Sequence, residues 1–194
     1  MNLGDLQGLM ARRRAGSGLS LSEFCADPLI AALRWPEDVV EQWLYDHGDN
    51  GAFQRDYGHV DLARIAWSLE PVTATELCGM PTGASDDGCI DYYAENPDYW
   101  AAARSSGAHE GVARCWAEQG TWTRPPVLLD RALVYPEGTG TGLQVVEGRT
   151  RVGVLRGRSR QGSLVAAQHQ AWVGRPAPVS ARSSAPRGAD RLPH

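Results

Sequence analysis

An apolar run that leads through a glycine into a helical pattern is the feature that most restricts the fold of this chain. Residues 143–146 (Leu-Gln-Val-Val) are short and largely apolar, which predicts a buried strand. The stretch from Arg149 to about Arg160, closed by Gly162, predicts a helix. Gly148 lies between the two, where a missing side chain lets the backbone approach a ligand. A helix that begins there presents unpaired N–H groups and a positive dipole end, so we expect a phosphate or similar anion at this junction.

Arginines occupy the first turn of this expected helix, where the helix dipole normally disfavours cations. Their presence makes sense when an anion lies between them and the helix end. We therefore expect four residues to bind the ligand: Gly148, Arg149, Thr150 and Arg151. Three more arginines follow on the same helix, and for these a solvated helix surface is the preferred interpretation: Arg156, Arg158 and Arg160.

The chain has 194 residues, 42% of them hydrophobic, which is enough for one sizeable core. Length alone favours one domain with appendages. No apolar run approaches the roughly 20 residues that span a bilayer. Arg12-Arg13-Arg14 is not followed by the apolar stretch of a signal peptide. We expect a soluble, cytoplasmic protein with no membrane partner.

Residue usage excludes several kinds of site. The sequence contains no lysine, which excludes a phosphate-loop lysine and a Schiff-base lysine. Its four cysteines are far apart, with no C-x-x-C pair and no histidine at zinc-ligand spacing. His47 lies between Asp46 and Asp49, yet Gly48 and Asn50 beside it are typical of an ordinary turn. We expect buried free thiols and no resident metal site.

Charge is distributed unevenly along the chain. Residues 124–194 hold 11 arginines and four acids, a balance of +7, whereas residues 1–123 hold eight arginines and 19 acids, a balance of −11. One half is then able to attract an anion that the other half repels. Alternatively, the two halves neutralise each other across an internal interface. The sequence does not decide between these interpretations.

Local patterns place the remaining elements. Ser20 or Ser22 is the expected N-cap of a first helical segment, and Pro36 begins a second helix. Residues 66–72 alternate like a strand, and Pro71 indicates that this strand lies at a sheet edge. The other expected elements are a long loop at 81–99, a helix within 97–120, strands at 125–130 and 164–173, and a disordered tail at 176–194.

Two stretches carry a resemblance to a known superfamily: RPPVLLDRAL at 124–133 and GLQVVEGRTRVGVLRGRSRQG at 142–162. A strand after Pro-Pro, a second strand that ends in acid-Gly-x-x-Arg, a helix and a closing strand together resemble the ParB/sulfiredoxin superfamily, including ParB-like nuclease domains. The resemblance implies an α+β fold with a small mixed sheet and helices at 61–175. An N-terminal helical segment (1–60) precedes this domain, and the tail follows it.

In members of this superfamily the Gly-x-x-Arg segment contacts the phosphates of a nucleotide, which implicates residues 148–151. Sulfiredoxins have a catalytic cysteine directly after the glycine, but Arg149 stands there, so sulfiredoxin chemistry is not expected. ParB has glutamate at that place, so its CTP switch is not expected either. Chromosome partition is also not expected, because no helix-turn-helix is evident after the module. The motif is a near variant of the Asp-Gly-His-x-Arg of free-serine kinases and many ParB-like proteins, with Glu147 for Asp.

These observations favour a protein that binds a nucleotide or another phosphate-bearing ligand, with phosphoryl transfer or phosphodiester cleavage as the candidate reaction. Whether it is an enzyme stays open, because the candidate general bases or metal ligands Glu70, Glu76 and Glu147 are equally explained as caps or surface acids. The cofactor is not identified by the sequence, and a nucleotide with Mg²⁺ is the candidate. The alternative is a non-catalytic protein that binds nucleic acid through the arginine-rich helix or a protein partner through residues 20–47.

Overall fold

The computed structural model describes residues 1–15, 18–102, 111–138 and 140–178, and the fold is α+β, as the sequence predicts. Helices and strands follow one another in this order: η1 (Leu3–Leu6), α1 (Gln7–Arg14), α2 (Leu21–Ala26), α3 (Pro28–Ala31), α4 (Glu37–Val39), η2 (Val40–Tyr45), α5 (Gly51–Tyr57), η3 (Leu62–Arg64), β1 (Ile65–Thr73), α6 (Ala74–Gly79), η4 (Ala84–Asp86), α7 (Cys89–Glu95), α8 (Pro97–Ala102), α9 (Val112–Gln119), β2 (Val127–Asp130), α10 (Arg131–Val134), β3 (Leu143–Glu147), α11 (Arg149–Arg160) and β4 (Gln168–Pro176). Among the described residues, no helix combines the length and the apolar character needed to cross a membrane.

Four strands form one small mixed sheet in the order β1-β4-β2-β3. β4 is antiparallel to β1 and parallel to β2, and β2 is antiparallel to β3. β1 lies at an edge, as Pro71 predicts, because proline has no N–H group to donate within a central strand. β2 is central, and its residues Val127, Leu128 and Leu129 are completely buried.

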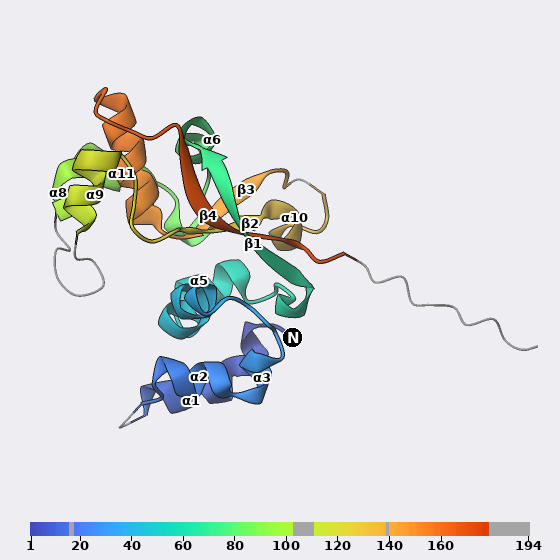
Figure 1. Ribbon diagram of the computed structural model, residues 1–194. Helices are drawn as coiled ribbons and strands as arrows, with labels where there is room; N and C mark the ends of the chain where they lie inside the picture. Colours follow the sequence, from blue (N-terminus) through green and yellow to red (C-terminus); the bar gives the residue numbers. More distant parts are fainter. Residues whose placement is uncertain (16–17, 103–110, 139, 179–194) are drawn as a thin grey trace, which may run out of the picture.

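Each face of the sheet is covered by a different group of helices (Figure 1). Side chains alternate along a strand, so Val127 and Leu129 of β2 face the N-terminal helices, whereas Leu128 faces α11. Residues 1–60 cover the first face, and α6, α7, α9 and α11 cover the second. The result is three layers: helices, sheet and helices.

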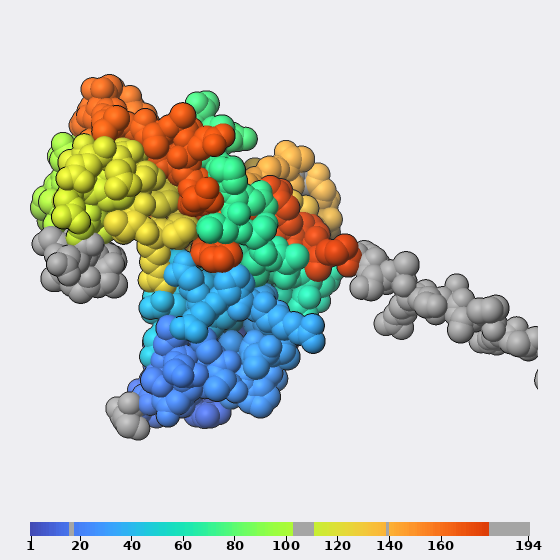
Figure 2. All heavy atoms as spheres, in the orientation of Figure 1, coloured from blue at the N-terminus to red at the C-terminus, as the bar shows by residue number. Residues whose placement is uncertain are grey.

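The N-terminal segment completes the hydrophobic core of the sheet. Trp43 is fully buried, and its ring centroid lies 6.0 Å from that of Phe53, 5.9 Å from Tyr57 and 5.5 Å from Trp67 of β1, all in edge contacts. Figure 2 shows the segment, in blue and cyan, as a lower lobe packed directly against the rest of the molecule. Residues 1–60 are therefore part of the globular core rather than an appendage to it.

The interpretation of residues 81–99 as a loop is wrong, because the segment forms η4, α7 and the start of α8. The physical reason is a tertiary contact. Gly153 and Gly157 of α11 have no side chains, so the backbone of Ile90 and Ala94 in α7 approaches closely. Ile90 and Ala94 are four residues apart, lie on one face of α7 and are buried against α11.

Other boundaries were predicted with mixed success. The helix at 149–160 is confirmed as α11, and Ser20 is confirmed as an N-cap that accepts from the Glu23 N–H. The last strand lies at Gln168–Pro176 instead of 164–173, so Pro176, assigned to the tail, belongs to β4. Its neighbour Ala177 donates its N–H to the Arg64 carbonyl at 2.7 Å. The expected tail from residue 179 onward lies outside the described residues.

The packing of α7 on α11 is tested by alanine substitution at Gly153. A methyl group there would overlap Tyr93 Cβ and lie 2.9 Å from the Ile90 carbonyl oxygen. We expect Gly153→Ala to lower the free energy of unfolding by about 1–3 kcal/mol. At Gly8 of α1 an added methyl group would have no atom within 4 Å. Because alanine favours the helix over glycine, Gly8→Ala should instead raise the free energy of unfolding by up to about 1 kcal/mol. Urea unfolding of both variants measures the difference, and equal effects would contradict the close contact.

Candidate ligand-binding site

A cavity of about 420 Å³ lies where the start of α11 meets the N-terminal segment and helices α8 and α9. Glu147 and all four residues predicted to bind the ligand, residues 148–151, line it. Six further polar residues line it that were not expected to act in the site: Glu41, Gln42, Asp46, His47, Thr123 and Arg124. The structure therefore brings the predicted residues together in one cavity and adds a second, N-terminal half to it.

Gly148 is the N-cap of α11 and can only be glycine. Its φ of +97° lies in the left-handed region, which residues with a side chain rarely adopt. A Cβ atom there would also lie 2.5 Å from Pro126 Cβ and 3.0 Å from Arg151 Nε. The N-cap makes no side-chain hydrogen bond to the helix, and the first turn of α11 lines the cavity.

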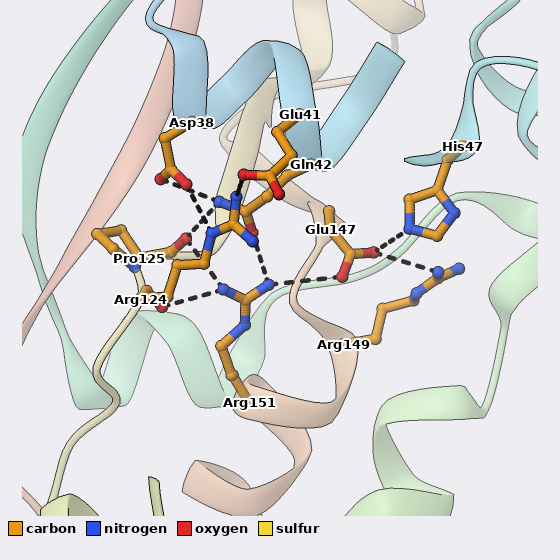
Figure 3. A network of polar contacts seen from close by, with 9 residues as sticks. All are labelled: Asp38, Glu41, Gln42, His47, Arg124, Pro125, Glu147, Arg149 and Arg151. Carbon is orange, nitrogen blue, oxygen red and sulfur yellow. Dashed lines mark hydrogen bonds and ion pairs between the residues drawn. The ribbon is translucent and has the colours of Figure 1, made fainter. Parts of the chain in front are cut away.

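The carboxylate of Glu147 joins the two halves of the site (Figure 3). Its Oε2 lies 3.2 Å from His47 Nε2 and 3.3 Å from Arg149 Nη2, and its Oε1 lies 3.4 Å from Arg151 Nη2. Burial alone would raise the pKa of Glu147. The hydrogen bond from His47 and the charges of Arg151 and Arg149 outweigh burial and lower this pKa from 4.5 to about 2. The side chain is therefore ionised at neutral pH, and it is a poor proton acceptor there.

Arg151 is held by groups other than the carboxylate. Nη1 donates to the carbonyl oxygens of Arg124 at 3.0 Å and Pro125 at 3.1 Å, and Nη2 donates to Gln42 Oε1 at 2.7 Å. These contacts tie α11 to the chain that leads into β2 and to the N-terminal segment (Figure 3). Arg151 thus lines the cavity and also supports the fold.

The two residues of the motif that precede Arg151 have partners from η4 and α7. Arg149 forms an ion pair with Asp86, and only 20% of its side chain is exposed. Thr150 shares a hydrogen bond with the hydroxyl group of Tyr93, whose pKa is raised by burial. Both Thr150 and Tyr93 line the cavity, so a hydroxyl pair lies beside the first turn of α11.

The N-terminal half of the site is shaped by the π-helical turn η2, in which Asp46 donates its N–H to the Glu41 carbonyl five residues earlier. A π-helical turn brings side chains five residues apart to one face. Glu41 with Asp46, and Gln42 with His47, all line the cavity. In an α-helix the same spacing would separate the side chains by about 140°. A regular α-helical period therefore does not predict that these four residues line one cavity.

Asp38 anchors η2 to the rest of the site. It accepts from Arg124 Nε at 2.6 Å, from Trp172 Nε1 of β4 at 2.6 Å and from Gln42 Nε2 at 3.1 Å. Arg124 also pairs with Glu41 (Figure 3). These polar contacts thus hold the N-terminal segment in place relative to Arg124 and the sheet.

Four aromatic side chains also line the cavity and together form its aromatic wall. Tyr93 and Trp100 are packed edge to face with ring centroids 4.9 Å apart, and Trp116 and Trp122 are similarly packed at 6.0 Å. All four line the cavity, and Trp122 Nε1 is fixed by the Gln170 carbonyl at 2.9 Å. The cavity is thus lined by both charged and aromatic side chains.

Asp46 is the carboxylate of the cavity whose pKa lies above its ordinary value. Burial is the main cause, His47 and Arg124 oppose it, and the negative charges of Glu41 and Glu147 add to it. The shift of Asp46 and that of Glu147 are in opposite directions within one cavity.

The other two candidate catalytic carboxylates lie outside the cavity lining. Glu70 on β1 accepts from Arg175 Nη2 at 3.0 Å and from the Ser68 hydroxyl at 2.6 Å. Glu76 forms a capping box with Thr73 at the start of α6. Both side chains are accounted for by these structural contacts, and only Glu147 of the three is in the site.

The arginines farther along α11 are paired with acids from α7 and α8. Arg156 and Arg160 contact Asp91 at 3.0 and 2.7 Å, and Arg158 pairs with Asp98. The basic C-terminal half and the acidic N-terminal half of the chain therefore neutralise each other across internal contacts, which is the second of the two interpretations of the charge distribution.

Within the part of the chain that the structure describes, no three His, Cys, Asp or Glu side chains are placed to hold a metal ion. No family model, curated protein or solved structure matches the chain. Function is therefore argued from the chemistry of the cavity.

The role of Glu147 in stability is tested by its pH dependence. A pKa lowered from 4.5 to about 2 corresponds to a stabilisation on the order of 3 kcal/mol, present above pH 4.5 and lost as the pH falls through about 2. We expect Glu147→Gln to be less stable than the wild type by about this amount at pH 7 and by roughly half of it or less at pH 3. Urea unfolding at both pH values measures the difference, and a constant difference would show that the carboxylate is not held by these cations.

Proposed function

We propose that the protein binds a nucleotide in this cavity, with the phosphate at the start of α11 and the base at the aromatic wall, and that residues 61–176 form a ParB/sulfiredoxin-like module. The observation that carries the proposal is the meeting of two features in one cavity. A glycine-capped helix start and four aromatic side chains line the same cavity. A nucleotide has a phosphate for the helix start and a planar base for the aromatic side chains.

A phosphate at the start of α11 would interact with the positive end of the helix dipole and with Arg149. The N-terminus of a twelve-residue helix favours negative charge through its dipole. Arg149 follows Gly148 directly, and its guanidinium is held in the cavity wall by Asp86. Arginine binds phosphate oxygens through two parallel hydrogen bonds, so its placement beside the helix end suits a phosphate group.

At the other end, the size and the chemistry of the cavity favour a small planar group. A volume of about 420 Å³ lies within the range of roughly 300–1,000 Å³ that is typical of small-molecule sites. Stacking of a base on an aromatic side chain contributes about 1–3 kcal/mol. The aromatic wall is therefore a source of affinity that inorganic phosphate cannot use.

Nucleic acid is less well supported as the ligand. Binding to a polyanion needs arginines that can exchange counterions for phosphates, whereas Arg156, Arg158 and Arg160 of α11 already pair with acids of α7 and α8. A protein partner at residues 20–47 is also less well supported, because that segment packs into the core and lines the cavity.

Catalysis would add phosphoryl transfer or phosphodiester cleavage to binding. In either reaction a carboxylate can assist by accepting a proton from the nucleophile. Glu147, with a pKa of about 2, is unsuited to this role, whereas burial raises the pKa of Asp46 in the same cavity. Mg²⁺ would enter with the nucleotide, because this ion commonly binds through one or two carboxylates and substrate phosphates.

The phosphate end is tested by comparing two arginines of α11. Arg149 lines the cavity, whereas Arg160 is 60% exposed and pairs with Asp91. We expect Arg149→Ala to weaken nucleotide binding roughly 10- to 150-fold, the scale of one charge-assisted contact, and Arg160→Ala to leave it unchanged. Nucleotides with and without Mg²⁺ are first screened by thermal shift, and the best is titrated by calorimetry. Equal nucleotide affinities of the two variants would contradict the placement of the phosphate at the start of α11.

The aromatic end is tested at Trp100, which lines the cavity. We expect Trp100→Ala to weaken nucleotide binding about 5- to 150-fold, since one stacking contact is lost, and to leave inorganic phosphate binding unchanged. Tyr135 contacts Arg131 instead and does not line the cavity, so Tyr135→Ala is the control. A loss of phosphate binding in Trp100→Ala would show that the substitution disturbs the whole site and not the base contact.

A further inference from the structure

We propose that the carboxylate of Glu147 is an internal competitor of the ligand: it occupies the anion position between Arg149 and Arg151, and a bound phosphate replaces it there. This inference rests on the proposed function, because it assigns a regulatory contact to the same site. The ligand-free protein would then hold its own site closed with a side chain of the binding motif.

The distances indicate that Glu147 is the replaceable partner of the two arginines. Charge-assisted N–H···O bonds are usually about 2.7–2.9 Å long. Glu147 lies 3.3 Å from Arg149 Nη2 and 3.4 Å from Arg151 Nη2, so it is close to both and optimally bonded to neither. The carboxylate is placed between the two cations without forming a tight bidentate pair with either.

The arginines, in contrast, are positioned by other groups that would remain after the carboxylate moves. Arg151 is bonded to Gln42 Oε1 at 2.7 Å and to the carbonyl oxygens of Arg124 and Pro125. Arg149 is paired with Asp86. Departure of Glu147 would therefore leave both guanidinium groups in place, with hydrogen-bonding capacity directed into the cavity.

Electrostatics makes simultaneous occupancy by two anions unfavourable. A phosphate at the start of α11 would lie beside the ionised Glu147, and like charges in a partly buried site repel strongly. The carboxylate has a second partner to which it can retain its bond, because His47 Nε2 lies 3.2 Å from its Oε2. A shift of Glu147 toward His47 would open the anion position and keep the carboxylate paired.

This exchange links ligand binding to the N-terminal segment. His47 follows the π-helical turn η2, and its contact with Glu147 is the one that the exchange alters. Binding that changes this contact is coupled to the conformation of the segment that holds His47, and the coupling acts in both directions. Ligand binding in the cavity would thereby be coupled to the conformation of the N-terminal helices.

The experiment measures the affinity of the full chain for inorganic phosphate and for ATP by calorimetry. We expect Glu147→Gln to bind phosphate about tenfold more tightly than the wild type or more, although it is less stable. Glu70→Gln, which removes a carboxylate paired with Arg175 outside the cavity, is the control and should bind as the wild type does. Equal or weaker binding by Glu147→Gln, with binding by the wild type intact, overturns the competitor role and leaves the proposed function standing. Absence of phosphate and ATP binding by all three proteins overturns both.

A second measurement uses the wild type, so it does not depend on the folding of the variant. The imidazole resonances of His47 are followed by NMR during a phosphate titration and are assigned with His47→Gln. We expect them to shift in proportion to occupancy, because Glu147 changes its contact with His47. Saturable phosphate binding with unchanged His47 resonances overturns the proposal.

Discussion

The site depends on one buried carboxylate that three cationic or hydrogen-bonding groups surround. Glu147 is the last residue of β3, and it contacts His47 from the N-terminal segment and Arg149 and Arg151 from the first turn of α11. Burying a charge is costly unless it is paired, so the strand end, the helix start and the N-terminal segment must take up their positions together. The geometry of the cavity is a consequence of that requirement. Residues far apart in the sequence are held within one polar network (Figure 3).

Charge pairing also explains why a chain with opposite charges in its two halves forms one compact unit. Arg124 pairs with Asp38 and Glu41 across the sheet interface, and the arginines of α11 pair with the acids that precede it. Pairs on the surface contribute little to stability individually. Together, they pair basic groups of the C-terminal half with acids of the N-terminal half.

The sequence predicted those parts of the fold and site that local rules determine. The β3–Gly148–α11 junction was recognised because an apolar run, a glycine and a helical period are all local signals, and Pro71 located the edge strand for the same reason. Tertiary contacts determined the rest. Helix α7 depends on a groove that the glycines of α11 provide, which its own polar sequence does not reveal. His47 was interpreted as part of a turn because Gly48 and Asn50 beside it are typical turn residues, and the π-helical turn that places it in the cavity has no local signal in the sequence.

Because of the π-helical turn at Val40–Tyr45, the site depends on the number of residues in this turn as well as on their identities. Each residue advances an α-helix by about 100°. Removal of one residue from this turn would therefore rotate His47 away from Glu147 even with every side chain of the cavity unchanged. Glu41 with Asp46, and Gln42 with His47, would no longer share one face of the helix.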